Sequence, residues 1–314
     1  MKQHNLYDLR GKRVFIAGHN GLMGSSLVKR LSLEDVEILT ATRDELDLTR
    51  QIEVEKWISK FKPEVVIIAA AKVGGIHSNA NYPADFIYQN TQIASNLIHS
   101  SFLAKVEKVI MLGSSCTYPK MADQPIQESS LLDGKPEETN QWYSIAKLSG
   151  IKLGEAYRRQ YGMDCISILP TNLYGPRDNF DPLNSHVIPG LLNRFLEAKR
   201  QKKDEEILWG TGTPRREFMH VDDASDAIVF LIKNYSDNEP INVGTGKEIN
   251  IITLANLIAK IVGYEGEIRF DITKPDGALR KLLDSSKLEK MGWKPKIGLE
   301  QGLIETYNWY IKLN

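Results

Sequence analysis

The sequence predicts an α/β fold: a doubly wound parallel sheet, followed by a smaller and partly interleaved C-terminal domain. Short β-branched apolar runs alternate with longer segments of helical spacing through the first half of the chain. This rhythm is typical of β-α-β units with right-handed crossovers. A glycine-rich turn also follows the first apolar run. The 314 residues, 42% hydrophobic and 25% charged, suffice for one large domain or two smaller ones.

The first strand is expected at Arg13–Ala17, which is apolar and β-branched. A helix follows at Leu22–Leu33, where apolar residues recur at helical spacing. Val65–Ala70 is apolar throughout, as expected of a parallel strand that is covered on both faces. The same criteria give strands at Val36–Ala41, Val109–Leu112 and Cys165–Leu169, and helices at Ile52–Phe61, Pro83–Leu103 and Tyr143–Tyr161.

After Pro170 the alternation loosens. We expect a loop rich in Asn, Asp, Gly and Pro over Thr171–Ser185 and a helix over Val187–Arg200. Residues 1–170 are therefore predicted to form a dinucleotide-binding domain and residues 171–314 mainly a substrate domain, with some segments returning to the first. Short helices are expected near the C-terminus at Asp223–Leu231, Leu254–Ile261 and Leu303–Tyr310.

Charge and cysteine content exclude several classes of function. Forty basic and forty acidic residues cancel, so we expect no nucleic acid or anionic membrane as a partner. No apolar run reaches the length of a membrane span, and Met1–Arg10 lacks an apolar signal core. Cys116 and Cys165 form neither a disulfide framework nor a metal-ligand spacing, so no metal site is expected. A cytoplasmic location follows as the expectation.

The turn after the first strand suits a cofactor pyrophosphate. Gly18 permits a sharp turn, Gly21 lets backbone N–H groups approach oxygen, and Gly24 permits close packing of helix on sheet. The helix beginning at Leu22 offers free N–H donors at its N-terminus. The alternative is an ordinary tight strand–helix turn, which seldom needs three glycines. The spacing G-x-x-G-x-x-G resembles that of the extended short-chain dehydrogenase/reductase superfamily.

The end of the second strand indicates the cofactor. NAD-binding proteins usually place a carboxylate there, whereas NADP-binding proteins place an arginine for the 2′-phosphate. Arg43 precedes the first acid in this sequence, which favours NADPH. Asp44 and Asp47 are the alternative contacts to the adenosine.

Tyr143 and Lys147 lie four residues apart, on one face of a predicted helix. Ser114 follows the fourth predicted strand, at the sheet edge where open α/β sheets bind ligands. A phenol, an ammonium and a hydroxyl at these positions indicate hydride transfer at a carbon–oxygen centre, with the protein supplying the proton. Alone, the Tyr–Lys pair is also compatible with a solvated helix face.

Several longer segments resemble the GDP-L-fucose synthase family. They span most of the chain: AAAKVGGI at 69–76, LGSSCTYP at 112–119, PTNLYGP at 170–176, NFDPLNSHVIP at 179–189, REFMHVDD at 216–223 and RKLLD at 280–284. The resemblance implies that GDP-4-keto-6-deoxy-D-mannose is epimerised at C3 and C5 and then reduced at C4 with NADPH.

In that family a cysteine and a histidine move the protons at C3 and C5, and the matching residues here are Cys116 and His186. We assign Cys116 as base and His186 as acid, although the sequence does not fix which face of the sugar each occupies. Cys116 follows a strand end, whereas Cys165 lies inside an apolar strand and is expected to be packing. For His186, a helix cap or surface role is the alternative.

The same resemblance assigns substrate contacts to Asn172, Trp209, Arg216 and Lys281. An arginine fork and a lysine suit diphosphate oxygens, while core packing is the alternative for Trp209. Asn20 stands where relatives carry an arginine that helps to hold the 2′-phosphate. Ala278 and Leu279 also depart from the family pattern, beside the predicted sugar loop.

Two other functions remain compatible with the sequence. A sister enzyme acting on a related GDP-4-keto sugar, in a colitose or 6-deoxy-heptose pathway, would use some or all of these steps. A nucleotide-binding protein without turnover would need the glycine turn but not the other groups. By resemblance to the superfamily, a homodimer through the helices at Pro83–Leu103 and Tyr143–Tyr161 is expected.

Overall fold

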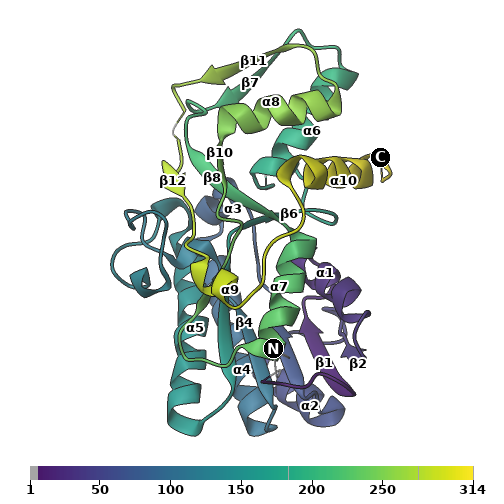
Figure 1. Ribbon diagram of the computed structural model, residues 1–314, viewed down its shortest axis with the longest axis vertical. Helices are drawn as coiled ribbons and strands as arrows, with labels where there is room; N and C mark the ends of the chain where they lie inside the picture. The colour runs from purple at the N-terminus through teal and green to yellow at the C-terminus, as the bar shows by residue number, and fades with distance from the viewer. Residues whose placement is uncertain (1–5, 183, 275, 314) are drawn as a thin grey trace.

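The fold is taken from a computed structural model that describes residues 6–182, 184–274 and 276–313. Its centre is a parallel sheet of six strands in the order β2-β1-β3-β4-β5-β9 (Figure 1). The order changes direction beside β1, as in a doubly wound sheet, so the predicted fold class is confirmed. The strands are β1 Lys12–Ala17, β2 Val36–Leu39, β3 Val65–Ile68, β4 Lys108–Leu112, β5 Cys165–Pro170 and β9 Ile241–Val243.

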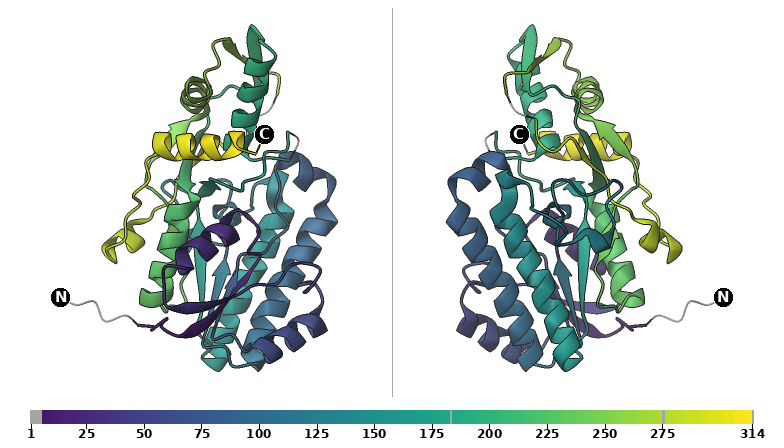
Figure 2. Two further views of the ribbon diagram at one scale, coloured as in Figure 1. Left: turned by 90° about the vertical axis from the view of Figure 1, so that its right-hand side faces the viewer. Right: turned by 90° about the vertical axis from the view of Figure 1, so that its left-hand side faces the viewer.

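Helices cover both faces of this sheet. On one face lie α1 (Leu22–Leu31) and α7 (Val221–Asn234), and on the other lie α2 (Gln51–Phe61), α4 (Pro83–Leu103) and α5 (Gln141–Tyr161). The two groups of helices stand on opposite sides of the strands in Figure 2. This arrangement explains why β3 is apolar at every position, and why apolar residues predominate on both faces of β1, β4 and β5.

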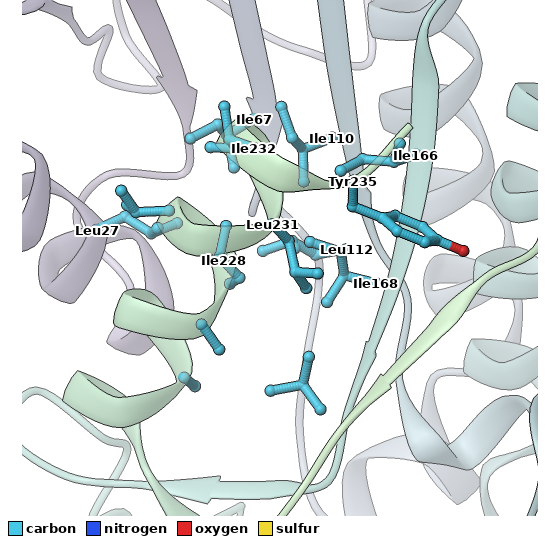
Figure 3. Packing of buried hydrophobic residues seen from close by; sticks show 14 of the residues in the cluster. Leu27, Ile67, Ile110, Leu112, Ile166, Ile168, Ile228, Leu231, Ile232 and Tyr235 are labelled. Atoms are coloured by element: carbon cyan, nitrogen blue, oxygen red, sulfur yellow. The ribbon is translucent and has the colours of Figure 1, made fainter. Parts of the chain in front are cut away.

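The core follows from that double coverage. Along β4, Ile110 and Leu112 face α1 and α7, whereas Val109 and Met111 face α4 and α5. Figure 3 shows the first of these two clusters, in which side chains of neighbouring strands pack with those of α7. Each fully buried Leu or Ile side chain contributes about 1.5–3 kcal/mol from burial. The sheet is therefore a rigid base for the loops at its edges.

The C-terminal half builds a second layer above the carboxyl ends of the strands (Figure 1). Strand β8 (Arg215–His220) pairs with β6 (Asn172–Tyr174), β10 (Glu248–Asn250) and β12 (Arg280–Lys281). A separate pair joins β7 (Glu205–Trp209) to β11 (Glu267–Asp271). The remaining helices are α6 Val187–Arg200, α8 Ile251–Val262, α9 Ser286–Lys290 and α10 Leu299–Ile311.

Three short elements differ from the sequence-based expectations. The expected loop at Thr171–Ser185 begins with strand β6, because Asn172–Tyr174 pairs in parallel with Phe218–His220. A helix α3 (Ile76–Asn81) and a 3-10 turn η1 (Ser115–Thr117) were also not predicted. The boundary at residue 170 stays a prediction. Helix α7 and strand β9, which follow it in the sequence, pack on the large sheet.

No helix within the described residues is both long enough and apolar enough to cross a membrane. Within the same residues, no group of three or more His, Cys, Asp or Glu side chains is arranged to hold a metal ion.

Candidate active site

The turn between β1 and α1 approaches the end of β3 closely. Gly18 has a φ of +90°, which side-chain-bearing residues rarely adopt, and a Cβ there would lie 2.6 Å from the backbone nitrogen of Ala70. A Cβ at Gly24 would overlap the carbonyl oxygen of Gly18. Gly21 caps α1 without a side-chain hydrogen bond, so the N–H groups at Leu22 and beyond stay available. These features fit the pyrophosphate of a dinucleotide.

The end of β2 presents one cation. Arg43 is exposed just beyond the strand, and Asn20 of the glycine turn is exposed as well. Glu45 folds back onto Thr42 and accepts hydrogen bonds from its N–H at 2.7 Å and its hydroxyl at 2.9 Å. These hydrogen bonds hold the pKa of Glu45 below its usual range. A 2′-phosphate at this position would thus meet Arg43 but also a fixed carboxylate.

Tyr143 and Lys147 occupy the first turns of α5, which packs beside α4. The ammonium of Lys147 lies 5.8 Å from the centre of the Tyr143 ring and donates to the carbonyl oxygen of Leu112 at 2.8 Å. Burial lowers the pKa of Lys147 to about 8. Burial also raises the pKa of Tyr143, the charge of Cys116 adds to this shift, and a hydrogen bond with Ser114 opposes it. The phenol is therefore held in its protonated form.

Ser114 and Cys116 lie where β4 turns into η1. The hydroxyl of Ser114 caps this turn by accepting from the N–H of Cys116 at 3.2 Å. The hydroxyl of Ser144 on α5 donates to the carbonyl oxygen of Cys116 at 2.7 Å. Consequently η1 and α5 are fixed to each other, which brings the predicted Ser114, Cys116 and Tyr143 together. Cys165, by contrast, is buried against Gly154, as predicted for a packing residue.

Two cations of the second layer face the same thiol. Lys281 on β12 donates to the Sγ atom of Cys116 at 3.6 Å, and Arg216 on β8 interacts electrostatically with Cys116. The two cations are adjacent because Lys281 pairs with Arg216 in the register of β12 and β8. Burial lowers the pKa of Arg216, but a guanidinium stays charged at neutral pH. This corner of the site is therefore positively charged.

Asn172 and Trp209 lie on separate strands. Asn172 on β6 donates to the backbone oxygen of Glu217 at 2.8 Å, which fixes its amide beside β8. Trp209 ends β7 with 71% of its surface exposed, and the ammonium of Lys274 lies 5.7 Å from its ring centre. Core packing is therefore ruled out for Trp209. An exposed indole beside a cation leaves a flat apolar surface for a ligand.

His186 caps helix α6 with extended backbone, and its side chain is exposed. The loop that carries it packs on the segment after β3, because Gly75 N–H donates to the carbonyl oxygen of Asn184 at 3.0 Å. Although solvent reaches the side chain, the many protein atoms around it still desolvate the imidazole in part and lower its pKa, so it is mainly neutral at pH 7. Contacts among the described residues do not join His186 to Cys116. Their cooperation stays a prediction.

Glu217 is a residue that the sequence-based reasoning missed. Its carboxylate is fully buried and accepts backbone hydrogen bonds from Thr245 at 2.5 Å, Gly246 at 2.8 Å and Leu283 at 3.0 Å. The only signal in the sequence is that this acid stands directly before the apolar residues Phe218 and Met219, and an acid that is buried with them needs partners. Burial raises the pKa of Glu217, while the hydrogen bonds from these donors lower it.

Comparisons with known proteins agree with this geometry. A model of the NAD dependent epimerase/dehydratase family matches residues 14–244. GDP-L-fucose synthase 1 of Arabidopsis thaliana is 55% identical over 96% of this chain and 94% of its own. GDP-L-fucose synthase of Escherichia coli strain K12 is 51% identical over 96% of this chain and 97% of its own.

Solved structures give the same picture. A GDP-6-OMe-4-keto-L-xylo-heptose reductase from C. jejuni superimposes with a TM-score of 0.92 at 34% identity, covering 98% of this chain and 99% of that one. A GDP-L-fucose synthetase from Naegleria fowleri bound to NADP gives 0.90 at 25% identity, covering 99% and 97%.

Proposed function

Since this chain belongs to the NAD dependent epimerase/dehydratase family, and within it to the GDP-L-fucose synthases, we propose that it converts GDP-4-keto-6-deoxy-D-mannose to GDP-L-fucose. The reaction has two stages: epimerisation at C3 and C5, followed by reduction of the C4 ketone. The observation that carries the proposal is that a thiol, a phenol and two cations converge where β4 and α5 meet.

Epimerisation uses the acidity of the protons at C3 and C5, which lie on either side of the C4 ketone. A base removes one of these protons to give an enolate, and an acid returns a proton to the opposite face of the same carbon. Cys116 and His186 are the proposed pair, with Cys116 as base in the first assignment. The neutral imidazole expected from its lowered pKa can also accept a proton, so the roles can be exchanged.

Reduction places a proton on the C4 oxygen, and Tyr143 is the proposed donor. Its raised pKa keeps the phenol protonated until the oxygen becomes negative. Ser114 orients the phenol through their hydrogen bond, and Lys147 stabilises the phenolate that remains. NADPH, when bound, supplies the hydride.

The proposed cofactor site consists of Gly18, Gly21, Leu22, Gly24, Arg43 and Lys147. NADPH is preferred to NADH because Arg43 is the exposed cation at the end of β2 and because a related fucose synthetase binds NADP. Asn172, Trp209, Arg216 and Lys281 are the proposed contacts to the GDP-sugar. A cytoplasmic location belongs to the proposal, since an active Cys116 must stay reduced.

A homodimer is also part of the proposal, and exposed apolar side chains on α4 and α5 support it. Tyr88 and Leu103 on α4 are each 55% exposed, and Ile145 and Tyr161 on α5 are 40% and 52% exposed. Such clustering on two neighbouring helices is typical of a protein interface.

The test is incubation with GDP-4-keto-6-deoxy-D-mannose and NADPH in deuterated water. We expect deuterium at C3 and C5 of the product, together with oxidation of one NADPH per sugar reduced. Reduction without deuterium at either carbon would instead assign the chain to the reductases, in line with its likeness to the heptose enzyme. Cys116→Ser is the control, because it should abolish exchange while leaving the Tyr143 chemistry in place.

A further inference from the structure

Lys281, one of the proposed substrate contacts, also lies against the thiol of the candidate active site. Its ammonium is 3.6 Å from the Sγ atom of Cys116, a residue 165 positions earlier in the chain. Strand β12 is only two residues long, Arg280–Lys281, and lies at the edge of its sheet. So short a strand has too few ladder hydrogen bonds to fix a side chain by itself. Something else must hold β12 in place.

Glu217 fixes the position of β12 through hydrogen bonds. One carboxylate oxygen accepts from the N–H of Leu283, two residues beyond Lys281, and the other accepts from Thr245 and Gly246 after β9. All of these partners are donors, so both oxygens act as acceptors, which is the pattern that suits a carboxylate. The absence of a side chain at Gly244 makes space for this carboxylate, since a Cβ there would lie 2.5 Å from the Oε1 atom of Glu217.

A second tether comes from the segment that follows Cys116. Gln124 accepts from the N–H of Leu282 at 2.8 Å through its Oε1 atom. Ile126 donates to the carbonyl oxygen of Leu282 and accepts from the N–H of Asp284, both at 2.8 Å. The backbone around Lys281 is thus fastened to the chain that carries Cys116 on one side and to Glu217 on the other.

We propose that Glu217 is a positioning residue that holds Lys281 against Cys116, and that Lys281 thereby serves the proton-transferring thiol. An ammonium beside sulfur favours the negative charge that sulfur carries whenever it reacts as a base or nucleophile. The inference rests on the proposed function of Cys116. It adds to that function a buried carboxylate that never touches the substrate.

The test uses the free protein and measures alkylation of Cys116 by iodoacetamide at a fixed pH of about 7.5, where thiolate reactivity can be followed without substrate. Peptide mass spectrometry separates Cys116 from the buried Cys165. In Glu217→Gln, the amide oxygen can face Thr245 and Gly246, but the NH₂ group then faces the N–H of Leu283 and the tether is lost. We expect Glu217→Gln and Lys281→Met each to slow alkylation about 3- to 10-fold.

A double variant that combines Glu217→Gln with Lys281→Met tests whether Glu217 acts through Lys281. If Glu217 acts through Lys281, the double variant should be no slower than Lys281→Met alone. Additive effects, or an unchanged rate in Glu217→Gln, would overturn the proposal. Should Glu217→Gln fail to fold, Glu217→Asp keeps the charge but withdraws both oxygens, and an unchanged rate there would contradict the proposal equally.

Glu248→Gln is the matched control. Glu248 bonds Arg215 and Arg280 at 2.8 Å each, so it joins the same two strands, but through side chains. Its alkylation rate should stay within about twofold of wild type, because partly exposed ion pairs contribute little. With substrate, Glu217→Gln should lower the rate of C3 and C5 exchange while leaving NADPH affinity unchanged. If the wild-type protein shows no deuterium exchange at C3 and C5, the proposed function is refuted. The role of Glu217 would then be decided by the alkylation rates alone.

Discussion

At the scale of single residues, burial acts in opposite directions on the two groups of the reductive centre. It raises the pKa of Tyr143 and lowers that of Lys147, because each loses hydration of its charged form. The proposed role of Tyr143, giving a proton to the C4 oxygen, would benefit from a phenol that stays protonated beforehand. The negative charge then appears on the phenol only as the ketone is reduced.

Tyr143→Phe should separate the two stages of the reaction. The ring remains, so packing is kept, but the proton donor is gone. NADPH oxidation should fall about 10²- to 10⁴-fold, whereas deuterium should still enter C3 and C5. Single-turnover absorbance and mass spectrometry of the recovered sugar measure both. A variant that reduces the ketone at the wild-type rate would show that another group donates the proton.

Arg43→Ala should weaken NADPH binding without much effect on NADH. Loss of one charge-assisted hydrogen bond costs about 1.5–3 kcal/mol, so Kd for NADPH should rise by roughly 10- to 100-fold. Titration calorimetry with both cofactors measures the ratio of the Kd for NADPH to the Kd for NADH. Arg50→Ala, another exposed arginine that already lies 3.8 Å from Asp47, is the control and should not change it. Equal losses for both cofactors would mean that Arg43 does not contact the 2′-phosphate.

Four residues that the sequence identified, Ser114, Cys116, Tyr143 and Lys147, share one property: each sits just after a strand end or on a regular helix. Ser114 and Cys116 follow β4 directly, and Tyr143 and Lys147 are one helical turn apart. The contact between Lys281 and Cys116 was beyond reach, because it depends on how β12 is held across 165 positions. The role of Glu217 was missed because its position before an apolar pair indicates only that it needs partners, and the backbone groups that satisfy it carry no sequence signature.

At the scale of elements, the long helices and buried strands were predicted well because their patterns are long or strongly apolar. Strand β6 and helix α3 were not, since three and six residues give too little periodicity. Strand β6 forms only because β8 is available to pair with it. Such elements are decided by tertiary contacts rather than by their own residues.

Helix α5 carries a measurable link between ionisation and stability. Lys147 has a pKa of about 8 in the folded protein, below the 10.5 of a solvated lysine. Between these values the unfolded chain binds more protons, so the contribution of Lys147 to stability rises with pH across this window. Wild type should therefore gain on the order of 1–3 kcal/mol relative to Lys147→Met from pH 7.5 to 10.

Urea unfolding of both proteins at the two pH values measures this gain. Lys152→Met, on the same helix but 42% exposed beside Glu155, should show no comparable change relative to wild type. A constant difference between wild type and Lys147→Met would mean that Lys147 keeps its proton when the chain folds.

At the scale of the whole molecule, the large sheet is a scaffold for two layers of function. The turns proposed to bind the cofactor lie at the carboxyl ends of its strands, and the strands proposed to contact the substrate lie in the layer above (Figure 1). The apolar surface of α4 and α5 lies on the outside of the same scaffold. The proposed dimer interface and the proposed proton donor would thus share α5, because the helix that carries Tyr143 also exposes Ile145 and Tyr161.

Tyr88→Lys should dissociate the proposed homodimer. A charge placed among apolar side chains at an interface must be desolvated, which should raise the dimer dissociation constant at least about tenfold. Light scattering after size exclusion measures the mass across a dilution series. Leu33→Lys, at a side chain that is 79% exposed beyond α1, is the control. If Tyr88→Lys stays dimeric, the interface lies elsewhere. If the wild-type protein is monomeric, the proposed dimer does not exist.

The hydrogen bonds between Ile126 and the backbone of Leu282 and Asp284 have a mechanical consequence. They connect the segment that follows Cys116 to the segment that follows Lys281, so these two parts of the chain are held together. A movement of the second layer over the large sheet would have to keep these hydrogen bonds, so Cys116 and Lys281 would stay together during it.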